Sequence, residues 1–485
     1  MTRDKSFGKN ILYSGGSAVS NVFLIVIGIM AARILGDRSF GYFSFALALA
    51  SIFETGIDLG MNTLVVRSIA RKRDLAGTYL ATILAWKLVL SIVSMTLMVL
   101  TVNILHPTAE ARTATYIIGA AIVLRSYKAT THSFFQAYER FDLIMLTTFV
   151  ERIGIMVFTV AALLWTRRLI PFAAAYALVR IPDLFYAMWL VHRHIAPIRL
   201  LIPKRQTVKE IQLGALPFGA SGVIATLYAS IGTVILSSMS SMENVGLYSA
   251  SYKIYEGLTM FPYIICAVLL PRISSLYGSN REKHHHLSLQ VIRYLILSSI
   301  PVMYVTGLFS TQIIFLFYGR EYLPAVVLLR ILLGAAALMF VNWTLTTVLN
   351  SADKEKVVLR ITSYGLLVMT AATLLLVKFF GNSGAAYAVV VSEAFVFVMY
   401  VRTVSKSLFR VPIGRLIWRP AVATAAALLL TIPASAAGNL AAALAFVLAY
   451  TLALYVLRVF DAEDIETLKS LIPTRSAKAT ASGKP

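Results

Sequence analysis

Eight basic side chains lie inside long apolar segments of this 485-residue sequence. They are Lys87, Arg125, Lys128, Arg152, Arg180, Lys253, Arg293 and Arg330. A cation near the centre of a bilayer costs roughly 2.5–3.5 kcal/mol on insertion scales, so eight lipid-facing cations would cost on the order of 20 kcal/mol. We therefore expect them to face a protein interior, a carboxylate or a water-filled cavity. Such a cluster is typical of a site for an anion.

One apolar segment carries a stripe of polar side chains spaced by three, four and four residues. The stripe consists of Arg125, Lys128, His132 and Gln136. At 100° per residue these side chains share one face of a helix. An arginine fork fits phosphate oxygens, and lysine adds a point charge. We expect the stripe to line a cavity that captures a pyrophosphate, with snorkelling to the interface as the alternative.

Three further cations, Arg152, Arg180 and Lys253, are candidates for the same cationic cavity. Arg180 and Lys253 each precede an acid by three residues, a spacing that permits an ion pair on one helix. Each pair is either a fixed internal ion pair or a gated pair that opens when a substrate phosphate arrives. Arg293 and Arg330 lie nearer the ends of their segments, where snorkelling is expected.

Three carboxylates are candidates for charge balancing or for coupling to a cation. Glu54 and Asp58 are four residues apart, so they share one helix face. They could neutralise the arginines of the cavity, or they could bind a coupling proton or cation. Glu256, three residues after Lys253, is the third candidate.

The elements that position these residues are membrane-spanning helices. The chain is 58% hydrophobic and 14% charged, with a mean hydropathy of +0.78, whereas a soluble domain is about 25% charged. Apolar segments of about 20 residues, the length that crosses a bilayer, recur along the whole chain. The sequence therefore predicts an all-α integral membrane protein. The fourteen predicted spans are 10–33, 40–62, 79–103, 114–135, 143–166, 169–191, 211–238, 245–270, 288–309, 324–349, 357–378, 382–403, 417–436 and 438–458.

The basic residues of the loops predict the orientation of these spans. If the N-terminus is cytoplasmic, the inner segments hold 29 Lys and Arg residues and the outer segments hold 7. Cytoplasmic loops carry this excess, so we expect both termini to be cytoplasmic. The net charge of +22 lies in short loops rather than on a basic domain, which argues against a nucleic-acid partner. The single cysteine, Cys266, excludes an intrachain disulfide.

A weak internal repeat predicts two lobes. Lys9-Asn-Ile-Leu-Tyr is matched by Lys209-Glu-Ile-Gln-Leu, and Gly41-Tyr-Phe-Ser by Gly246-Leu-Tyr-Ser, six spans later. Unless the match is chance, it predicts a six-helix lobe at 1–200, a second at 201–410, an extra helix pair at 411–460 and a cytoplasmic tail at 461–485. Substrate would bind between the lobes.

Helix breakers occur at the inner ends of the first span of each predicted lobe. Gly15 and Gly16 lie in the first span, and Pro217 lies at a matching depth in the seventh. Proline inside a helix frees a carbonyl and permits a kink. We expect these residues to act as hinges at a lateral opening, with ordinary packing as the alternative.

Three local motifs resemble those of a known family. They are Gly36-Asp-Arg-Ser-Phe-Gly-Tyr-Phe-Ser, Phe53-Glu-Thr-Gly-Ile-Asp-Leu-Gly-Met-Asn and Arg67-Ser-Ile-Ala-Arg. They resemble the first outer loop and the inner end of span two in polysaccharide and O-antigen flippases of the multidrug/oligosaccharidyl-lipid/polysaccharide exporter superfamily. The layout of spans and short loops matches along nearly the full length.

The resemblance implies two six-helix lobes around a cationic cavity in a bacterial inner membrane. It implies that an undecaprenyl-pyrophosphate-linked oligosaccharide moves from the inner to the outer leaflet for polysaccharide export. The implied partners are this lipid-linked oligosaccharide, membrane lipids, and a polysaccharide polymerase with its chain-length machinery. Alternating access is the expected mechanism.

The motifs of enzymes and metal sites are missing from the sequence. It has no H-E-x-x-H, Walker or Gly-rich dinucleotide motif, so we expect no enzyme, no cofactor and no metal site. Two other functions stay open. A cation-coupled multidrug exporter of the same superfamily is disfavoured because the intramembrane charge is net basic. A membrane glycosyltransferase or polymerase is disfavoured because no sizeable outer loop is predicted.

Overall fold

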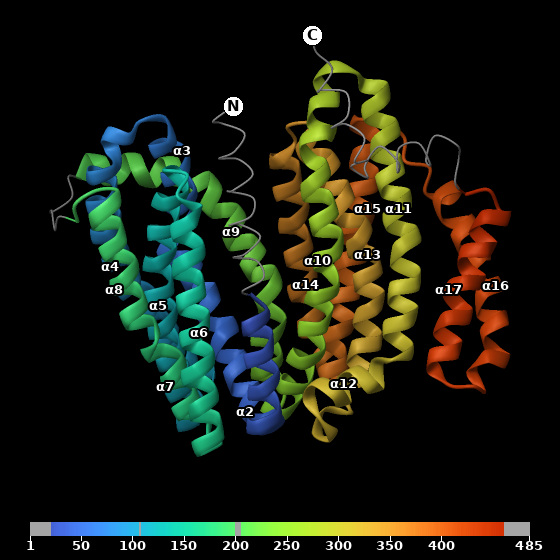
Figure 1. The fold of residues 1–485 in the computed structure, drawn as a ribbon, viewed down its shortest axis with the longest axis horizontal. Coiled ribbons are helices and arrows are strands. Elements are labelled where there is room, and N and C mark those ends of the chain that lie inside the picture. The colour runs from blue at the N-terminus through green and yellow to red at the C-terminus, as the bar shows by residue number, and fades with distance from the viewer. Residues whose placement is uncertain (1–20, 106–107, 199–204, 460–485) are drawn as a thin grey trace, which may run out of the picture. The chain divides into compact units, whose positions relative to one another are not determined.

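A computed structural model describes residues 21–105, 108–198 and 205–459. Within these ranges every regular element is a helix (Figure 1). The helices are α2 (Asn21–Asp58), α3 (Met61–Arg71), α4 (Ala76–Leu105), α5 (Ala109–Ala137), α6 (Phe141–Thr166), α7 (Leu169–Leu178), α8 (Arg180–His194), α9 (Arg205–Met239), α10 (Met242–Ser279), α11 (Arg281–Leu308), α12 (Ser310–Tyr318), α13 (Ala325–Ser351), α14 (Glu355–Phe380), α15 (Asn382–Ser407), α16 (Ile413–Ser435) and α17 (Asn439–Val456), with short 3-10 turns η1 (Arg73–Leu75) and η2 (Arg320–Tyr322).

Among the described residues, 11 helices are long and apolar enough to cross a membrane. They coincide with all the predicted spans except the first, second and fourth. The fourth lies on α5, where the charged and polar stripe lowers the mean hydropathy. The first two lie on α2, and the start of the first is outside the described residues. The prediction of an all-α membrane protein is confirmed.

Two backbone breaks shape the N-terminal helices. Gly36, with φ 78° and ψ 170°, interrupts α2 at the predicted outer loop, and glycine adopts this conformation without steric cost. Leu59 (φ 42°) and Gly60 (φ 84°) then separate α2 from the short α3. The sequence prediction missed α3, which is amphipathic and buries Met61, Val65 and Ile69. It joins the second predicted span to the loop that follows.

Contacts divide the chain into two units. The first is Met1–Glu256, Thr311–Leu332 and Leu359–Val396, and the second is Gly257–Ser310, Leu333–Val358 and Phe397–Pro485. These units are groups of contacts, and the predicted six-helix lobes remain a prediction.

In the first unit, the two glycines of the predicted repeat lie close together. A Cβ atom at Gly41 would collide with the backbone of Met242 and lie 3.1 Å from the nitrogen of Gly246. A Cβ atom at Gly246 would collide with the backbone of Asp37. The start of α10 therefore packs directly on the part of α2 that follows Gly36. Glycine at both positions permits this approach of two backbones.

In the second unit, α16 and α17 pack side by side and against α11 (Figure 1). The rings of Tyr304 and Phe446 stack with centroids 3.8 Å apart, and the Tyr450 hydroxyl donates to the carbonyl of Leu297 at 3.2 Å. The predicted helix pair at 411–460 thus exists and is anchored on α11 by aromatic side chains.

Candidate functional site

The first unit holds seven of the eight intramembrane cations, and five of these lie near carboxylates of α2, α6 or α8: Lys87, Arg125, Lys128, Arg152 and Arg180. Arg125 of α5 reaches Glu54 of α2: its Nε donates to Oε1 at 2.9 Å, and its Nη2 pairs with Oε2. The two bonds form a bidentate pair, the strongest geometry for guanidinium and carboxylate. The Arg125 side chain is still 37% exposed, and that of Glu54 is 19% exposed. Arg125 is therefore held in place yet accessible from outside the protein.

Lys87 of α4 occupies a fully enclosed site. Its Nζ lies 2.9 Å from Oδ1 of Asp58 and donates to the carbonyl of Ser126 at 3.1 Å. Longer bonds reach the hydroxyl of Ser126 at 3.3 Å and Asn62 at 3.4 Å. The side chain has no exposed surface. The sequence left the role of Lys87 open, and the structure shows an ammonium whose donors are satisfied by α2, α3 and α5.

Lys128 of α5 is the centre of a buried network between α5, α6 and α8. Its Nζ lies 2.8 Å from a carboxylate oxygen of Glu151 and 2.8 Å from one of Asp183. It also donates to the carbonyl of Thr147 at 3.0 Å. All three charged side chains are at most 6% exposed. Lys128 thus fixes three helices to one another.

Arg180 extends this network toward α7. Its Nη1 lies 2.7 Å from Glu151, and its Nη2 donates to the hydroxyl of Tyr176 at 2.7 Å. Arg152 directly follows Glu151 in the chain but lies farther from it in space, with its Nη1 3.8 Å from Oε1 of Glu151. Breaking a buried pair by removing one partner costs about 3–5 kcal/mol, because the other charge stays buried. Glu151, which serves two cations directly, is the residue on which the network depends most.

The side chains of the expected stripe on α5 differ in their exposure. Arg125 and Gln136 are partly or fully exposed, Lys128 is buried, and His132 binds the hydroxyl of Thr147 at 2.9 Å. Arg180, also expected to line a cavity, is only 2% exposed. Of the two cations of the stripe, Arg125 is the one that a ligand could reach without first breaking a buried ion pair.

The pairing of charges differs in part from the expectation. Arg180 and Asp183, three residues apart, do not pair with each other, because Glu151 and Lys128 approach them from neighbouring helices. Lys253 and Glu256 do form the expected pair, at 2.7 Å, with side chains 61% and 41% exposed. Glu54 and Asp58 each hold a cation, which agrees with charge balancing.

Sequence reasoning assigned no role to another buried carboxylate of the first unit, Glu393 of α15. The hydroxyl of Tyr228 in α9 donates to Glu393 at 2.9 Å and lies 2.9 Å from the hydroxyl of Ser392. Ser392 in turn donates to the carbonyl of Gly365 in α14 at 2.9 Å. The signal was a lone acid inside an apolar segment, but its partner Tyr228 lies 165 residues away in the chain. Among the described residues, no group of three or more His, Cys, Asp and Glu side chains is arranged to hold a metal ion.

Of the expected hinge residues, Pro217 lies inside α9, and Gly15 and Gly16 are outside the described residues. Close to Pro217, α9 meets the junction of α2 and α3. A Cβ atom at Gly219 would collide with the backbone of Leu59. Nearby, Nε1 of Trp86 donates to Gln212 at 3.0 Å. This contact joins the seventh predicted span to the second and third.

We expect Gly219→Val to separate α9 from the α2–α3 junction, because the added side chain collides with backbone that cannot rotate away. Cysteines at positions 86 and 212, in a chain with Cys266 replaced by serine, should be joined by a short bismaleimide in the parent and several-fold less in the Gly219→Val form. Gly222→Val is the matched control, since a Cβ atom at Gly222 meets nothing within 4 Å. Equal cross-linking in both variants would show that the close approach at Gly219 is not required.

Comparisons with known proteins agree with the fold. The model of the polysaccharide biosynthesis protein family matches residues 7–277, and the MatE family model matches residues 217–375. An uncharacterized membrane protein of Methanocaldococcus jannaschii is 23% identical over 407 residues, which cover 80% of this chain and 94% of that protein.

Two solved structures share the fold at low identity. The lipid II flippase MurJ, in an inward closed conformation, has a TM-score of 0.73 at 15% identity and covers 92% of this chain and 98% of its own. An inward-facing multidrug resistance MATE family transporter of the MOP superfamily has a TM-score of 0.67 at 17% identity and covers 84% and 98%. The arrangement of helices is therefore shared with these two membrane proteins.

Proposed function

Because the chain belongs to the polysaccharide biosynthesis protein family, we propose that it is a flippase for a lipid-linked oligosaccharide. It moves an undecaprenyl-pyrophosphate-linked oligosaccharide from the inner to the outer leaflet of a bacterial inner membrane. The product supplies the export of a cell-surface polysaccharide such as an exopolysaccharide. The excess of basic residues in the predicted inner loops supports cytoplasmic positions for both termini.

One observation carries this proposal: Arg125 is a partly exposed guanidinium at membrane depth whose partner is a carboxylate. The pyrophosphate of the cargo offers the same kind of oxygen that Glu54 now supplies to Nε and Nη2. Exchange of one bidentate partner for another keeps the cation paired throughout. Lys128 and Arg180 do not offer this exchange, since each is buried among several partners.

The charge balance among the ion-paired groups of α2, α4, α5, α6 and α8 supports an anionic cargo. Lys87, Arg125, Lys128, Arg152 and Arg180 face four carboxylates, those of Glu54, Asp58, Glu151 and Asp183. The cations thus outnumber the carboxylates by one even when all of these ion pairs are formed. When a phosphate binds Arg125, Glu54 is released and becomes available to a coupling proton or cation. His132, Arg152 and Lys253 are secondary contacts, and Asp58 and Glu256 keep their charge-balancing role.

In the proposed cycle the lipid tail stays in the bilayer while the sugar crosses inside the protein. An inward-open state admits the pyrophosphate to Arg125. The inner side then closes through the contact of α9 with the α2–α3 junction. The outer side opens, and the pyrophosphate is exposed to the other leaflet. A polymerase and its chain-length machinery would receive the product.

The MatE match over residues 217–375 favours one second candidate, a cation-coupled multidrug exporter. A deletion strain distinguishes the two. We expect it to lose surface polysaccharide and to accumulate lipid-linked oligosaccharide, because the cargo cannot reach the outer leaflet, while its susceptibility to cationic drugs is unchanged. Normal polysaccharide together with increased drug susceptibility would favour the exporter instead.

A further inference from the structure

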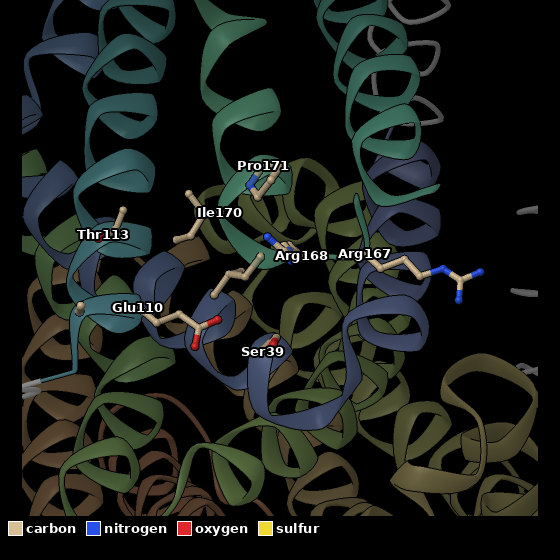
Figure 2. A pocket seen from close by; sticks show the side chains of 9 residues that line it. Ser39, Glu110, Thr113, Arg167, Arg168, Ile170 and Pro171 are labelled. Carbon is tan, nitrogen blue, oxygen red and sulfur yellow. The ribbon is translucent and has the colours of Figure 1, made fainter. Parts of the chain in front are cut away.

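Apart from the charges described above, the first unit contains a polar cavity of about 560 Å³ at the ends of its helices. It is formed by three elements: Ser39 of α2, the start of α5 with Glu110 and Thr113, and the linker and first residues of α7 with Arg168 (Figure 2). These segments are predicted outer loops. The volume is in the range of pockets that enclose small ligands.

Arg168 and Glu110 give the cavity a cation and an anion, beside Arg167, which also belongs to its lining. Both are exposed, and no ion pair joins either of them to another described residue. The neighbouring Arg167 extends away from the other lining side chains (Figure 2). A ligand that carried both a negative and a positive group could therefore pair with both side chains. A purely anionic group would be attracted by Arg168 and repelled by Glu110.

The surroundings place this cavity at the depth of lipid headgroups. Trp165, two residues before the linker, is 92% exposed, and its neighbour Leu164 is 64% exposed. Tryptophan is enriched where a membrane helix meets the interface. Trp165 and Leu164 thus expose apolar surface at the end of α6, which the linker joins to the start of α7 that lines the cavity.

Donors at the cavity fit a phosphate. The first turns of α5 and α7 both line it, and neither has a side-chain cap at its N-terminus. The N–H groups of the first turn of α5, and those of Leu169 and Ile170 in α7, add to the positive charge of Arg168, whereas Pro171 has no N–H to offer. The hydroxyls of Ser39 and Thr113 supply further hydrogen bonds.

We propose that this cavity binds the zwitterionic headgroup of an outer-leaflet phosphatidylethanolamine. Arg168, with the helix N-termini, holds the phosphate, and Glu110 holds the ammonium. This lipid site is independent of the cargo site at Arg125 and of the proposed flippase activity.

The test is lipid binding to the purified full-length protein in detergent, measured by native mass spectrometry with short-chain phosphatidylethanolamine, phosphatidylcholine and phosphatidylglycerol. Phosphatidylethanolamine should bind most tightly, since its ammonium donates hydrogen bonds that the methylated choline cannot. The dissociation constant of phosphatidylethanolamine should be roughly three- to fivefold lower than those of the other two lipids, which is the contribution of a partly exposed ion pair.

Single variants test which side chain binds the ammonium of the headgroup and which binds its phosphate. Glu110→Gln should remove the preference for phosphatidylethanolamine over phosphatidylglycerol, and Arg168→Gln should weaken the binding of both lipids. Arg320→Gln, which removes an exposed arginine of another predicted outer segment that does not line the cavity, should leave the preference intact. Equal binding of the three lipids, tighter binding of phosphatidylglycerol or of undecaprenyl pyrophosphate, or an equal effect of all three variants would overturn the proposal.

Discussion

An Arg125→Ala variant should lose polymer export while lipid-linked oligosaccharide accumulates facing the cytoplasm. The change removes the accessible fork that is proposed to hold the pyrophosphate, and it leaves Lys128 and Arg180 in their buried network. Hydrogen bonds to charged groups contribute about 1.5–3 kcal/mol each, so the loss of a bidentate contact corresponds to at least roughly tenfold in transport. Surface polysaccharide and the sidedness of the lipid-linked sugar are the measurements.

Controls separate binding from folding in this experiment. Arg112→Ala removes an arginine near the other end of α5 and should leave export unchanged, since Arg112 contacts Asn103 rather than the intramembrane carboxylates. Arg125→Ala combined with Glu54→Ala removes both partners, so no unpaired carboxylate remains, and it should be folded yet inactive. Normal export by a well-expressed Arg125→Ala protein would contradict the role of Arg125.

A Glu151→Ala variant should be strongly destabilised. It leaves Lys128 with Asp183 and removes the carboxylate partner of Arg180, and both cations are nearly fully buried. Removing one partner of a buried pair costs about 3–5 kcal/mol. We expect a lower midpoint of thermal unfolding in detergent and less folded protein in the membrane.

The exposed pair of Lys253 and Glu256 provides the comparison for Glu151. Their side chains are 61% and 41% exposed, so Glu256→Gln should change the free energy of unfolding by about 1 kcal/mol or less. If Glu151→Ala and Glu256→Gln lowered the unfolding midpoint equally, burial of the network would not be the source of its stability.

Most of the fold could be predicted because membrane spans leave a strong signal in composition. Apolar segments of about 20 residues located nearly every long helix. The short α3 escaped prediction because its boundary depends on two residues with positive φ, Leu59 and Gly60, and on burial against α5 and α9 rather than on hydropathy.

The cations at membrane depth could be recognised from the sequence, but most of their carboxylate partners could not. Cations inside apolar spans could be recognised from the free energy that a lipid-facing cation would cost. The carboxylate that each cation meets depends on how the helices rotate and pack against one another. The spacing within one helix predicted a pair of Arg180 with Asp183, whereas the structure pairs Arg180 with Glu151 on α6. The accessibility of Arg125 relative to Lys128 likewise follows from tertiary packing.

The most direct test of the account is the leaflet position of the cargo in proteoliposomes. Purified protein is reconstituted with undecaprenyl-pyrophosphate-linked oligosaccharide, and the fraction of sugar accessible to an external glycosidase is followed over time. The account predicts that the wild-type protein makes the lumenal fraction accessible and that the folded Arg125→Ala protein leaves it protected. Equal protection with the wild-type protein and with empty liposomes, or equal access with both protein forms, would contradict it.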